Sequence, residues 1–369
     1  MFEPEYRVVV VGAGVAGCEA ALEASRHGSK VLILEEHPQV GVPSHCSGVV
    51  SLNGLRLLGL EPHHSFAQRL IHGARIHPPN GEPFEVRRKE PVALILNRMR
   101  FDQFLAKQAI SRGVELRTNA RAVKFQPFND RSAAITLQNG EKISCRAVID
   151  ASGAGSRLPE QAGLESPDWS QLLPGLQYEL VDTQPQGDVV ELFFGERRAP
   201  GFFAWSIPTG DKSVRVGLAS KKGNVKKLLD ELVRDNWPRA TVDATKSGAV
   251  LVSGPLSRCW SQSFLVAGDA AGQVKQTTGG GIVIGGCCGM LAGRAASRFA
   301  ETKGENTDGL REYDVEWRKM FGSDLRRMGL ARRIFAGLSD DTLNRLFDAV
   351  RNHVGEIEEF ADMDFQGLI

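Results

Sequence analysis

The chain has 369 residues and a formal net charge of +1, and 42% of its residues are hydrophobic. This length predicts two or three structural units, and the near-neutral charge gives no bulk reason to expect nucleic acid as a partner. No uninterrupted apolar run reaches about 18 residues, so we predict no membrane-spanning helix. The six cysteines lack the spacing of metal ligands, so we expect no metal site. Acidic residues stand where a signal peptide would be positive, which predicts a cytoplasmic protein.

A dinucleotide-binding pattern begins the chain. Residues 7–36 contain a strand, a glycine-rich turn, a helix and a second strand, in the sequence RVVVVGAGVAGCEAALEASRHGSKVLILEE. Gly12 permits a tight turn, Gly14 lets the backbone approach a pyrophosphate, and Gly17 lets the helix pack on the strand. Glu35 ends the second strand about 20 residues later, where an acid binds a ribose hydroxyl. Because like charges repel, this acid opposes the 2′-phosphate of NADP and leaves FAD or NAD.

An unusual loop follows the second strand. Residues 42–50 read VPSHCSGVV and place His45 and Cys46 between proline and glycine, close to the expected nucleotide site. A free cysteine is often a small buried hydrophobic side chain. The alternative is a thiol that lies at the cofactor, and this stretch alone does not decide between the two.

Three later stretches carry further motifs. They are residues 95–125, where Arg98 precedes a helix over about 100–112; residues 147–158, where a strand runs into Asp150 and a small-residue turn; and residues 264–296, where a strand leads through Gly268 and Asp269 to a triple glycine and a long small-residue helix. In this order they resemble the FAD-dependent oxidoreductases of the aromatic-hydroxylase type. In that superfamily the arginine stretch and the Gly-Asp motif hold the pyrophosphate and ribityl chain, and the helix after the glycine run points its N-terminus at the flavin ring. The resemblance therefore implies FAD.

Two short motifs narrow the resemblance to one branch. That branch carries PxxCxG after the second strand and YxWxFP in the substrate domain. Residues 43–48, PSHCSG, fit the first motif, and residues 203–208, FAWSIP, match the second except for Phe203 in place of Tyr and Ile207 in place of Phe. The branch is the geranylgeranyl reductase family, which includes the archaeal digeranylgeranylglycerophospholipid reductases. The resemblance extends to about residue 300.

The resemblance assigns roles to individual residues. Cofactor contacts fall on Gly12, Gly14, Val15, Gly17, Glu35, Cys46, Ser47, Gly48, Arg98, Ala122, Gly268, Asp269, Gly280, Gly281 and Ile282, and substrate contacts fall on Phe203, Trp205 and Pro208. Cys46 would lie beside the isoalloxazine ring, so its thiol is expected near the redox centre and not in a disulfide. Cys46 and His45 are the candidate catalytic residues, with ordered water as an alternative proton source. For the adjacent Cys287 and Cys288 we favour close helix packing.

The predicted fold is α/β. A discontinuous Rossmann-type FAD-binding domain spans residues 1–72, 97–165 and 255–300; a β-rich α+β substrate domain spans 73–96 and 166–254; and a C-terminal helical region spans 301–369. The second segment of the substrate domain places apolar clusters between Gly, Pro and Asp turns, and residues 225–235 form an amphipathic helix. The C-terminal region mixes basic and apolar residues at helical spacing. It is either a solvated helix packed on its own protein or an interfacial helix at the inner face of the membrane.

The implied activity is FAD-dependent hydrogenation of carbon–carbon double bonds in isoprenoid (geranylgeranyl) chains of membrane lipids or their precursors. An isolated alkene is unpolarised, so the protein must supply an apolar tunnel, exact placement and exclusion of water and oxygen. Two alternatives stay open: a flavin monooxygenase or halogenase of the same fold, and a flavoprotein that carries electrons to a quinone. The chain shows no obvious second GxGxxG for a bound nicotinamide, so the external electron donor is either a ferredoxin or NAD(P)H.

Overall fold

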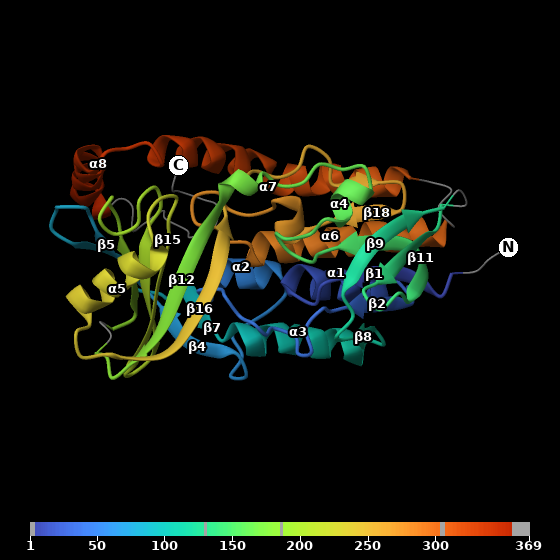
Figure 1. The fold of residues 1–369 in the computed structure, drawn as a ribbon, viewed down its shortest axis with the longest axis horizontal. Coiled ribbons are helices and arrows are strands. Elements are labelled where there is room, and N and C mark those ends of the chain that lie inside the picture. Colours follow the sequence, from blue (N-terminus) through green and yellow to red (C-terminus); the bar gives the residue numbers. More distant parts are fainter. Residues whose placement is uncertain (1–3, 129–130, 185–186, 303–306, 356–369) are drawn as a thin grey trace. The chain divides into compact units, whose positions relative to one another are not determined.

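The computed structural model describes residues 4–128, 131–184, 187–302 and 307–355 (Figure 1). The chain folds into two compact units, each built from separate stretches of sequence. The first unit comprises Met1–Pro43, Met99–Gln171 and Leu251–Gly329, and the second comprises Ser44–Arg98, Leu172–Val250 and Leu330–Ile369.

An eight-stranded sheet forms the centre of the first unit. Its strands are β1 (Tyr6–Val11), β2 (Val31–Leu34), β8 (Glu115–Arg117), β9 (Ala122–Pro127), β10 (Ala133–Leu137), β11 (Lys142–Asp150), β17 (Trp260–Ser261) and β18 (Phe264–Val266). Their order is β17–β18–β11–β1–β2–β8, with β10 and β9 as an antiparallel extension of β11. The pairs from β18 to β8 are parallel. Val8, Val9 and Val10 are fully buried, as expected for a strand that is covered on both faces.

Helices of the first unit connect and cover this sheet. They are α1 (Val15–Arg26), α3 (Arg98–Ser111), α4 (Leu158–Gln161), α6 (Ile282–Glu301) and α7 (Asp308–Phe335), with the short 3₁₀ helices η1 (Trp169–Gln171) and η2 (Gly268–Ala271). The first residue of α3 and the last turns of α7 are assigned to the second unit.

The small residues of α6 allow it to pack closely on α1 (Figure 1). A Cβ atom at Gly289 would overlap the carbonyl oxygen of Ala16, and one at Gly293 would overlap that of Ala20. Cys287 and Cys288 are buried in the same helix. Close helix packing, as predicted, therefore accounts for the composition of this segment.

Two sheets build the second unit. The larger has the order β16–β12–β15–β14–β13–β5–β6, and the smaller has the order β3–β7–β4. Their strands are β3 (Val49–Ser51), β4 (Ala67–Ile71), β5 (Gly73–His77), β6 (Phe84–Arg87), β7 (Ala93–Leu96), β12 (Leu172–Val181), β13 (Val189–Phe193), β14 (Ala204–Gly210), β15 (Ser213–Ala219) and β16 (Thr241–Leu251). The helices of this unit are α2 (Leu52–Leu57), α5 (Val225–Asn236) and α8 (Asp340–Asn352).

Each amphipathic helix of the second unit buries its apolar side against strand residues. Leu229 and Leu232 of α5 join a core cluster with residues of β12, β14 and β15. Leu343 and Phe347 of α8 cluster with Phe84 of β6. The burial of these apolar side chains is the main favourable contribution to holding the helices on the sheet.

The predicted fold class is confirmed, whereas the compact units divide the chain differently from the predicted domains. Residues 44–72, predicted as FAD-binding, fall in the second unit because β3 and β4 pair with β7 in a sheet of their own. Residues 301–329, predicted as part of a separate helical region, fall in the first unit. Tyr313 and Trp317 of α7 are buried there, and the Tyr313 hydroxyl donates to the carbonyl of Val266 at 2.8 Å.

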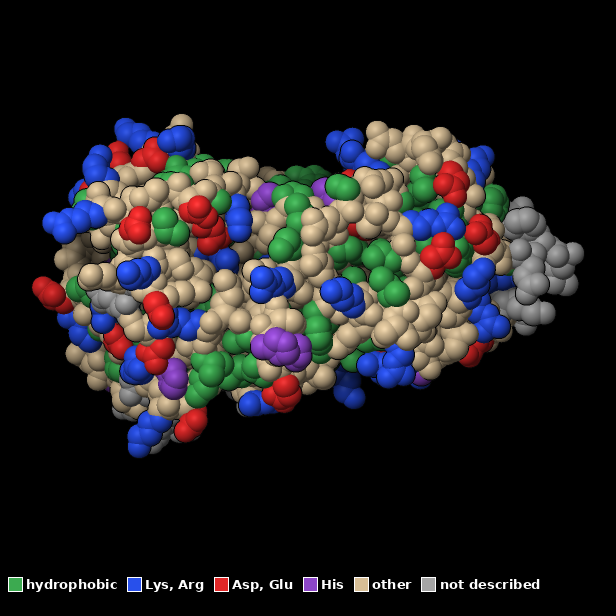
Figure 2. Space-filling view, turned by 90° about the horizontal axis from the view of Figure 1, so that it is seen from below, with side chains coloured by type: hydrophobic (Ala, Val, Ile, Leu, Met, Phe, Trp, Pro, Cys, Tyr) green, Lys and Arg blue, Asp and Glu red, His purple; other side chains and the backbone are tan. Residues whose placement is uncertain are grey.

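The surface of the described residues mixes both charge signs. On the face that Figure 2 shows, basic and acidic side chains are interspersed, with hydrophobic side chains between them. Within the described ranges, every helix is either too short or too polar to cross a lipid bilayer.

Candidate functional site

Three sequence motifs meet at the carboxyl edge of the first sheet. In the strand register Val11 of β1 pairs with Asp150 of β11, and Asp150 pairs with Val266 of β18. The three strands therefore end side by side. The glycine turn after β1, the small-residue turn after β11 and the Gly-Asp motif after β18 follow at this edge, which is where open α/β sheets bind ligands.

The glycines of the first turn meet three different steric requirements. Gly12 has φ +97°, and a Cβ there would lie 2.5 Å from the carbonyl oxygen of Ala151. A Cβ at Gly17 would overlap the carbonyl oxygen of Gly12. By contrast, a Cβ at Gly14, the N-cap of α1, would meet no described atom within 4 Å, and no side chain of the described residues caps this helix. The backbone is therefore crowded at Gly12 and Gly17 but has free space at Gly14, at the N-terminus of α1. This arrangement fits a phosphate bound at the helix N-terminus.

Glu35 is held beside this turn by three donors. Its Oε2 accepts from the backbone N–H of Ala13 at 2.9 Å, and its Oε1 accepts from the backbone N–H of His37 at 3.0 Å. The Nδ1 atom of His37 lies 2.7 Å from the same Oε1. A carboxylate has about four acceptor positions, so this arrangement leaves capacity for one further donor such as a ribose hydroxyl. Sequence reasoning missed His37, although a histidine two residues after the strand-end acid was a usable signal.

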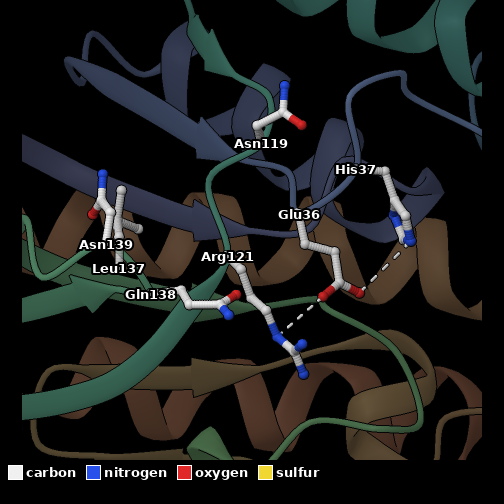
Figure 3. Close-up of a pocket in the computed structure, with 7 residues that line it drawn as sticks. All are labelled: Glu36, His37, Asn119, Arg121, Leu137, Gln138 and Asn139. Carbon is white, nitrogen blue, oxygen red and sulfur yellow. Dashed lines mark ion pairs between the residues drawn. The ribbon is translucent and has the colours of Figure 1, made fainter.

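A cavity of about 780 Å³ lies beyond the end of β2 (Figure 3). It is lined by Glu36, His37, Asn119, Arg121, Leu137, Gln138 and Asn139. Glu36 lies between two basic side chains, with its Oε2 3.3 Å from Nε of Arg121 and its Oε1 4.0 Å from Nε2 of His37. The cavity adjoins Glu35 and the predicted contact Ala122 along the chain, so it suits the polar adenosine end of a dinucleotide.

The other two turns at the edge are organised by Asp150 and Asp269. Asp150 is fully buried and accepts from the Ser152 hydroxyl at 2.6 Å and the Ser156 hydroxyl at 2.5 Å. Burial raises the pKa of Asp150 above its ordinary value, and the serine hydrogen bonds only partly oppose that effect. A Cβ at Gly281 would lie 2.6 Å from Oδ1 of Asp269, so glycine allows the start of α6 to approach this carboxylate.

The beginning of α6 is open in the same way as the beginning of α1. Gly281 is its N-cap, and no side chain in the described ranges caps it, while Gly280 and Ile282 are half-buried. The positive end of the helix dipole therefore lies next to the Gly268–Asp269 turn. Two uncapped helix N-termini and one acid at the edge of one sheet fit the phosphates and ribose of a dinucleotide.

The predicted thiol lies in the second unit. Cys46 is half-exposed, whereas the other five cysteines are buried. Its Sγ accepts from the backbone N–H of Gly48 at 3.4 Å, and the carbonyl of Gly48 accepts from the N–H of Leu96 at 2.8 Å. His45 is exposed in the same loop, and Arg98 is half-buried at the start of α3. Cys46, Ser47 and Gly48 thus form a short turn that the Gly48 N–H to Cys46 Sγ bond closes, next to the end of β7.

The predicted substrate residues Phe203, Trp205 and Pro208 do not share one face of the larger sheet. Phe203 and Trp205 make an edge contact with ring centroids 6.1 Å apart. Trp205 pairs with Gly217, whereas Pro208 pairs with Val214, whose side chain is in the α5 core. Strand alternation therefore places Pro208 on the face opposite to Trp205. The geometry favours Phe203 and Trp205 as substrate contacts over Pro208.

The face that carries Trp205 is partly polar. The indole N–H donates to Oε1 of Gln177 at 3.2 Å, and a Cβ at Gly217 would lie 2.7 Å from the indole ring. Gln177 is 2% exposed, and its Nε2 has no hydrogen-bond partner in the part of the chain that the structure describes. Since an indole only donates, the Gln177 amide orientation follows, and its buried N–H groups remain available to water or a ligand oxygen.

Comparison with known proteins identifies the family. Residues 7–166 match the FAD dependent oxidoreductase family. Digeranylgeranylglycerophospholipid reductase 2 of Methanothermobacter thermautotrophicus is 33% identical over 355 residues, covering 93% of this chain and 91% of the relative. A geranylgeranyl bacteriochlorophyll reductase-like protein of Thermoplasma acidophilum has a crystal structure with TM-score 0.88 and 27% identity, covering 94% of this chain and 91% of its own.

A more distant structure shares the fold alone. The p-nitrophenol 4-monooxygenase of Pseudomonas putida has TM-score 0.77 at 20% identity, covering 97% of this chain and 98% of its own. The glycine turn, Glu35 and the open helix N-termini fit the FAD that the family match requires. From its similarity to the archaeal reductase over most of its length, the chain belongs to the digeranylgeranylglycerophospholipid reductase family and is an FAD-dependent oxidoreductase.

Proposed function

We propose that this enzyme hydrogenates carbon–carbon double bonds in the geranylgeranyl chains of a membrane lipid or its precursor. The observation that carries the proposal is the 33% identity over nearly the whole chain to a digeranylgeranylglycerophospholipid reductase. The half-exposed Cys46 in this turn supports the proposal, because the turn belongs to the PxxCxG motif by which the chain resembles the reductase branch.

The first unit would hold the cofactor. Gly12, Gly14, Val15 and Gly17 would hold its pyrophosphate, Glu35 its ribose and the cavity beside Ala122 its adenine. Its flavin half would contact Gly268, Asp269, Gly280, Gly281 and Ile282. The family resemblance separately implies flavin contacts at Cys46, Ser47, Gly48 and Arg98 of the second unit. Reduced FAD, when bound, supplies the hydride. The chain's part is to orient the cofactor through backbone N–H groups and to stabilise negative charge at the start of α6.

The second unit would hold the lipid. Phe203 and Trp205 would lie along the isoprenoid chain, backed by an apolar cluster that contains Ile71, Ile95 and Ile207. An isolated alkene carries no charge and no hydrogen-bonding group, so these residues would contribute apolar contact and exclusion of water. The second alkene carbon needs a proton, for which the Cys46 thiol, the exposed His45 imidazole and water are the candidates.

The test is a single-turnover reaction with the purified protein. The bound cofactor is identified by its spectrum, reduced with dithionite without oxygen, and mixed with a digeranylgeranylglycerophospholipid. We expect reoxidation of the flavin together with a lipid that gains hydrogen in pairs by mass spectrometry. Cys46→Ala and His45→Ala distinguish the proton sources, because removal of the true donor slows reoxidation by about 10²-fold or more.

Other outcomes support other functions. A reduced enzyme that ignores the lipid but consumes oxygen and hydroxylates or halogenates an aromatic ring would be a monooxygenase or halogenase, which the shared fold permits. Reduction of a quinone with no loss of lipid double bonds would identify an electron carrier.

The reaction also needs an external electron donor. Ferredoxin and NAD(P)H are the two candidates for this donor. Mixing the oxidised enzyme with NADH, NADPH or reduced ferredoxin separates them by the rate at which the flavin absorbance bleaches.

We further propose that α7 contacts an anionic lipid surface. Leu330 and Ile334 are 54% and 57% exposed and lie one turn apart on the helix, which is unusual for large aliphatic side chains. Arg326, Arg327 and Arg333 are exposed on the same side, although Arg327 also lies 3.7 Å from Asp324. Apolar residues flanked by arginines are the pattern of an interfacial helix on anionic lipid.

Vesicle sedimentation tests this contact. Binding to phosphatidylglycerol vesicles and little binding to phosphatidylcholine vesicles is the expected result, and the double variant Leu330→Ser, Ile334→Ser should release the protein. Val315→Ser is the matched control, because Val315 is 59% exposed on the same helix but lies several turns away. Equal release by the control would contradict the assignment.

A further inference from the structure

Arg215 is a buried cation at the centre of the second unit's larger sheet. Arg215 is 6% exposed. It pairs with Ile207 of β14, which lies two residues after Trp205, so the Arg215 side chain is on the same face of the sheet as Trp205. Its Nε donates to Oε1 of Glu179 at 2.7 Å. Its Nη1 donates to the backbone carbonyl of Ser47 at 2.5 Å. One guanidinium therefore joins β12 to the turn that carries Cys46.

Glu179 has a second cationic partner. Nζ of Lys246 in β16 donates to the same Oε1 at 2.9 Å. Burial opposes ionisation of Glu179, but Arg215 first and Lys246 next outweigh it and hold the pKa of this carboxyl below its ordinary value. The carboxylate is thus charged at neutral pH and fixes the guanidinium in one orientation.

The turn itself is restrained on two sides. Gly48 has φ +81°, and a Cβ there would lie 2.6 Å from the carbonyl oxygen of Leu96 and 2.9 Å from Nη1 of Arg215. The Gly48 carbonyl accepts from Leu96, and the Gly48 N–H donates to the Cys46 sulfur. Two successive carbonyls of the turn are therefore hydrogen-bonded, that of Ser47 to Arg215 and that of Gly48 to Leu96 at the end of β7.

A buried arginine is costly for a sheet that could be filled with apolar residues. Replacing a buried ion pair by well-packed apolar side chains is often neutral or stabilising, so stability alone does not explain why arginine stands here. The fork of a guanidinium can hold a carboxylate and a carbonyl at the same time, which a single ammonium does less well.

We infer that Arg215 is a positioning residue that sets the conformation of the Cys46–Gly48 turn and thereby the presentation of the Cys46 thiol. Its meaning for catalysis rests on the proposed reductase function, whereas its structural effect on the thiol does not. Glu179 and Lys246 act through Arg215 by keeping its guanidinium in place.

The first experiment measures alkylation of Cys46 in the folded full chain, with iodoacetamide and mass spectrometry of the peptide that contains Cys46. Only this cysteine is half-exposed, so the reaction reports on the turn. Arg215→Met keeps the Glu179–Lys246 pair and so leaves no unpaired carboxylate. We expect alkylation to become about tenfold faster, which is the order expected when a charge-assisted hydrogen bond that holds a segment is lost.

Two further variants make the result decisive. Arg75→Met is the control, because Arg75 pairs with Glu85 at 2.9 Å across neighbouring strands of the same sheet and should leave the rate unchanged. Arg215→Lys should give an intermediate rate, and it replaces Arg215→Met if that variant does not fold. Rates within twofold of the wild type for a folded Arg215 variant would overturn the inference.

Turnover separates this inference from the proposed function. With the geranylgeranylated lipid, Arg215→Met should lower kcat and leave KM unchanged, since the lipid contacts stay in place. Alkylation needs neither FAD nor lipid, so an altered alkylation rate with an inactive wild type would uphold the positioning role and reject the reductase assignment.

Discussion

In the first unit the candidate site consists of glycines, helix N-termini and one strand-end acid, whereas in the second unit it consists of side chains from separate strands. Gly12, Gly14 and Gly17 act through the backbone that they leave accessible. Arg215 and Glu179 act through a hydrogen-bonded network that spans β12 and β15. Added atoms would clash in both units, at Gly12 and Gly17 in the first and at Gly48 in the second, but the site in the second unit also depends on charge pairing between Arg215 and Glu179.

Two glutamates show the same contrast in their electrostatics. Glu19 of α1 is 2% exposed, and its Oε1 has no hydrogen-bond partner among the described residues. Burial raises the pKa of Glu19 to about 7. Glu179 is also withdrawn from water, yet its two cations hold its pKa below the ordinary value. Burial disfavours the charge in both cases, and the presence of a partner decides the direction of the shift.

The largest expected effect comes from adding atoms between α1 and α6. Gly289→Val would push side-chain atoms into the backbone of Ala16, which should lower the free energy of unfolding by about 3 kcal/mol or more. Urea denaturation followed by circular dichroism measures this change. In Gly322→Ala the new Cβ would meet only Arg318 at 3.5 Å, so this helix variant should be neutral or slightly stabilising. Equal stability of the two variants would contradict the close backbone contact between α1 and α6.

Glu19→Gln should change the pH dependence of stability. Below pH 4.5 the carboxyl is protonated in both the folded and unfolded states; between pH 4.5 and 7 the unfolded chain ionises first, so the wild type loses stability as the pH rises. The variant cannot titrate there, so its stability relative to the wild type should rise by about 2 to 3 kcal/mol from pH 4.5 to pH 8. Denaturant titrations at both pH values measure this.

An exposed glutamate provides the control for this prediction. The side chain of Glu61 is 72% exposed, so Glu61→Gln should show no such trend. If the difference in the free energy of unfolding between Glu19→Gln and the wild type also stayed constant with pH, water would have to reach Glu19 in solution.

Glu35→Ala should weaken FAD binding without unfolding the first unit. The carboxylate accepts from Ala13 and His37, and the proposal adds a ribose hydroxyl as a further donor. Loss of one hydrogen bond to a charged group is worth about 2 kcal/mol, or roughly thirtyfold in the dissociation constant. Titration of the apoprotein with FAD, followed by flavin fluorescence, gives the constant. An unchanged constant would remove Glu35 from the cofactor site.

The smallest effect is expected in the side-chain-built unit. Trp205→Phe removes the indole N–H that donates to Gln177 and should lower the free energy of unfolding by about 1 kcal/mol. Chemical denaturation measures the change, and Trp169→Phe, at a residue 39% exposed, serves as the control. A loss of several kcal/mol would show that the second unit is as intolerant as the first.

Local sequence was sufficient to predict the strand, turn, helix and acid of residues 7–36, the motifs of the other two strand ends and the α/β class. Each of these patterns depends on near neighbours in the chain, where periodicity and glycine sterics act directly. The same reasoning found the loop that carries Cys46, but it did not find Arg215, which hydrogen-bonds to Ser47 in that loop. It also grouped residues 44–72 with the cofactor domain, whereas the contacts within the chain group them with the second unit.

Tertiary structure alone brought Glu179, Arg215 and Lys246 together. These residues are far apart in the chain, and the strand order β16–β12–β15 makes them neighbours on one face. Sequence order does not reveal which strands of an antiparallel sheet become adjacent, because that order is set by long-range pairing and burial. The same holds for the placement of Trp205 and Pro208 on opposite faces, which follows from the register between β14 and β15.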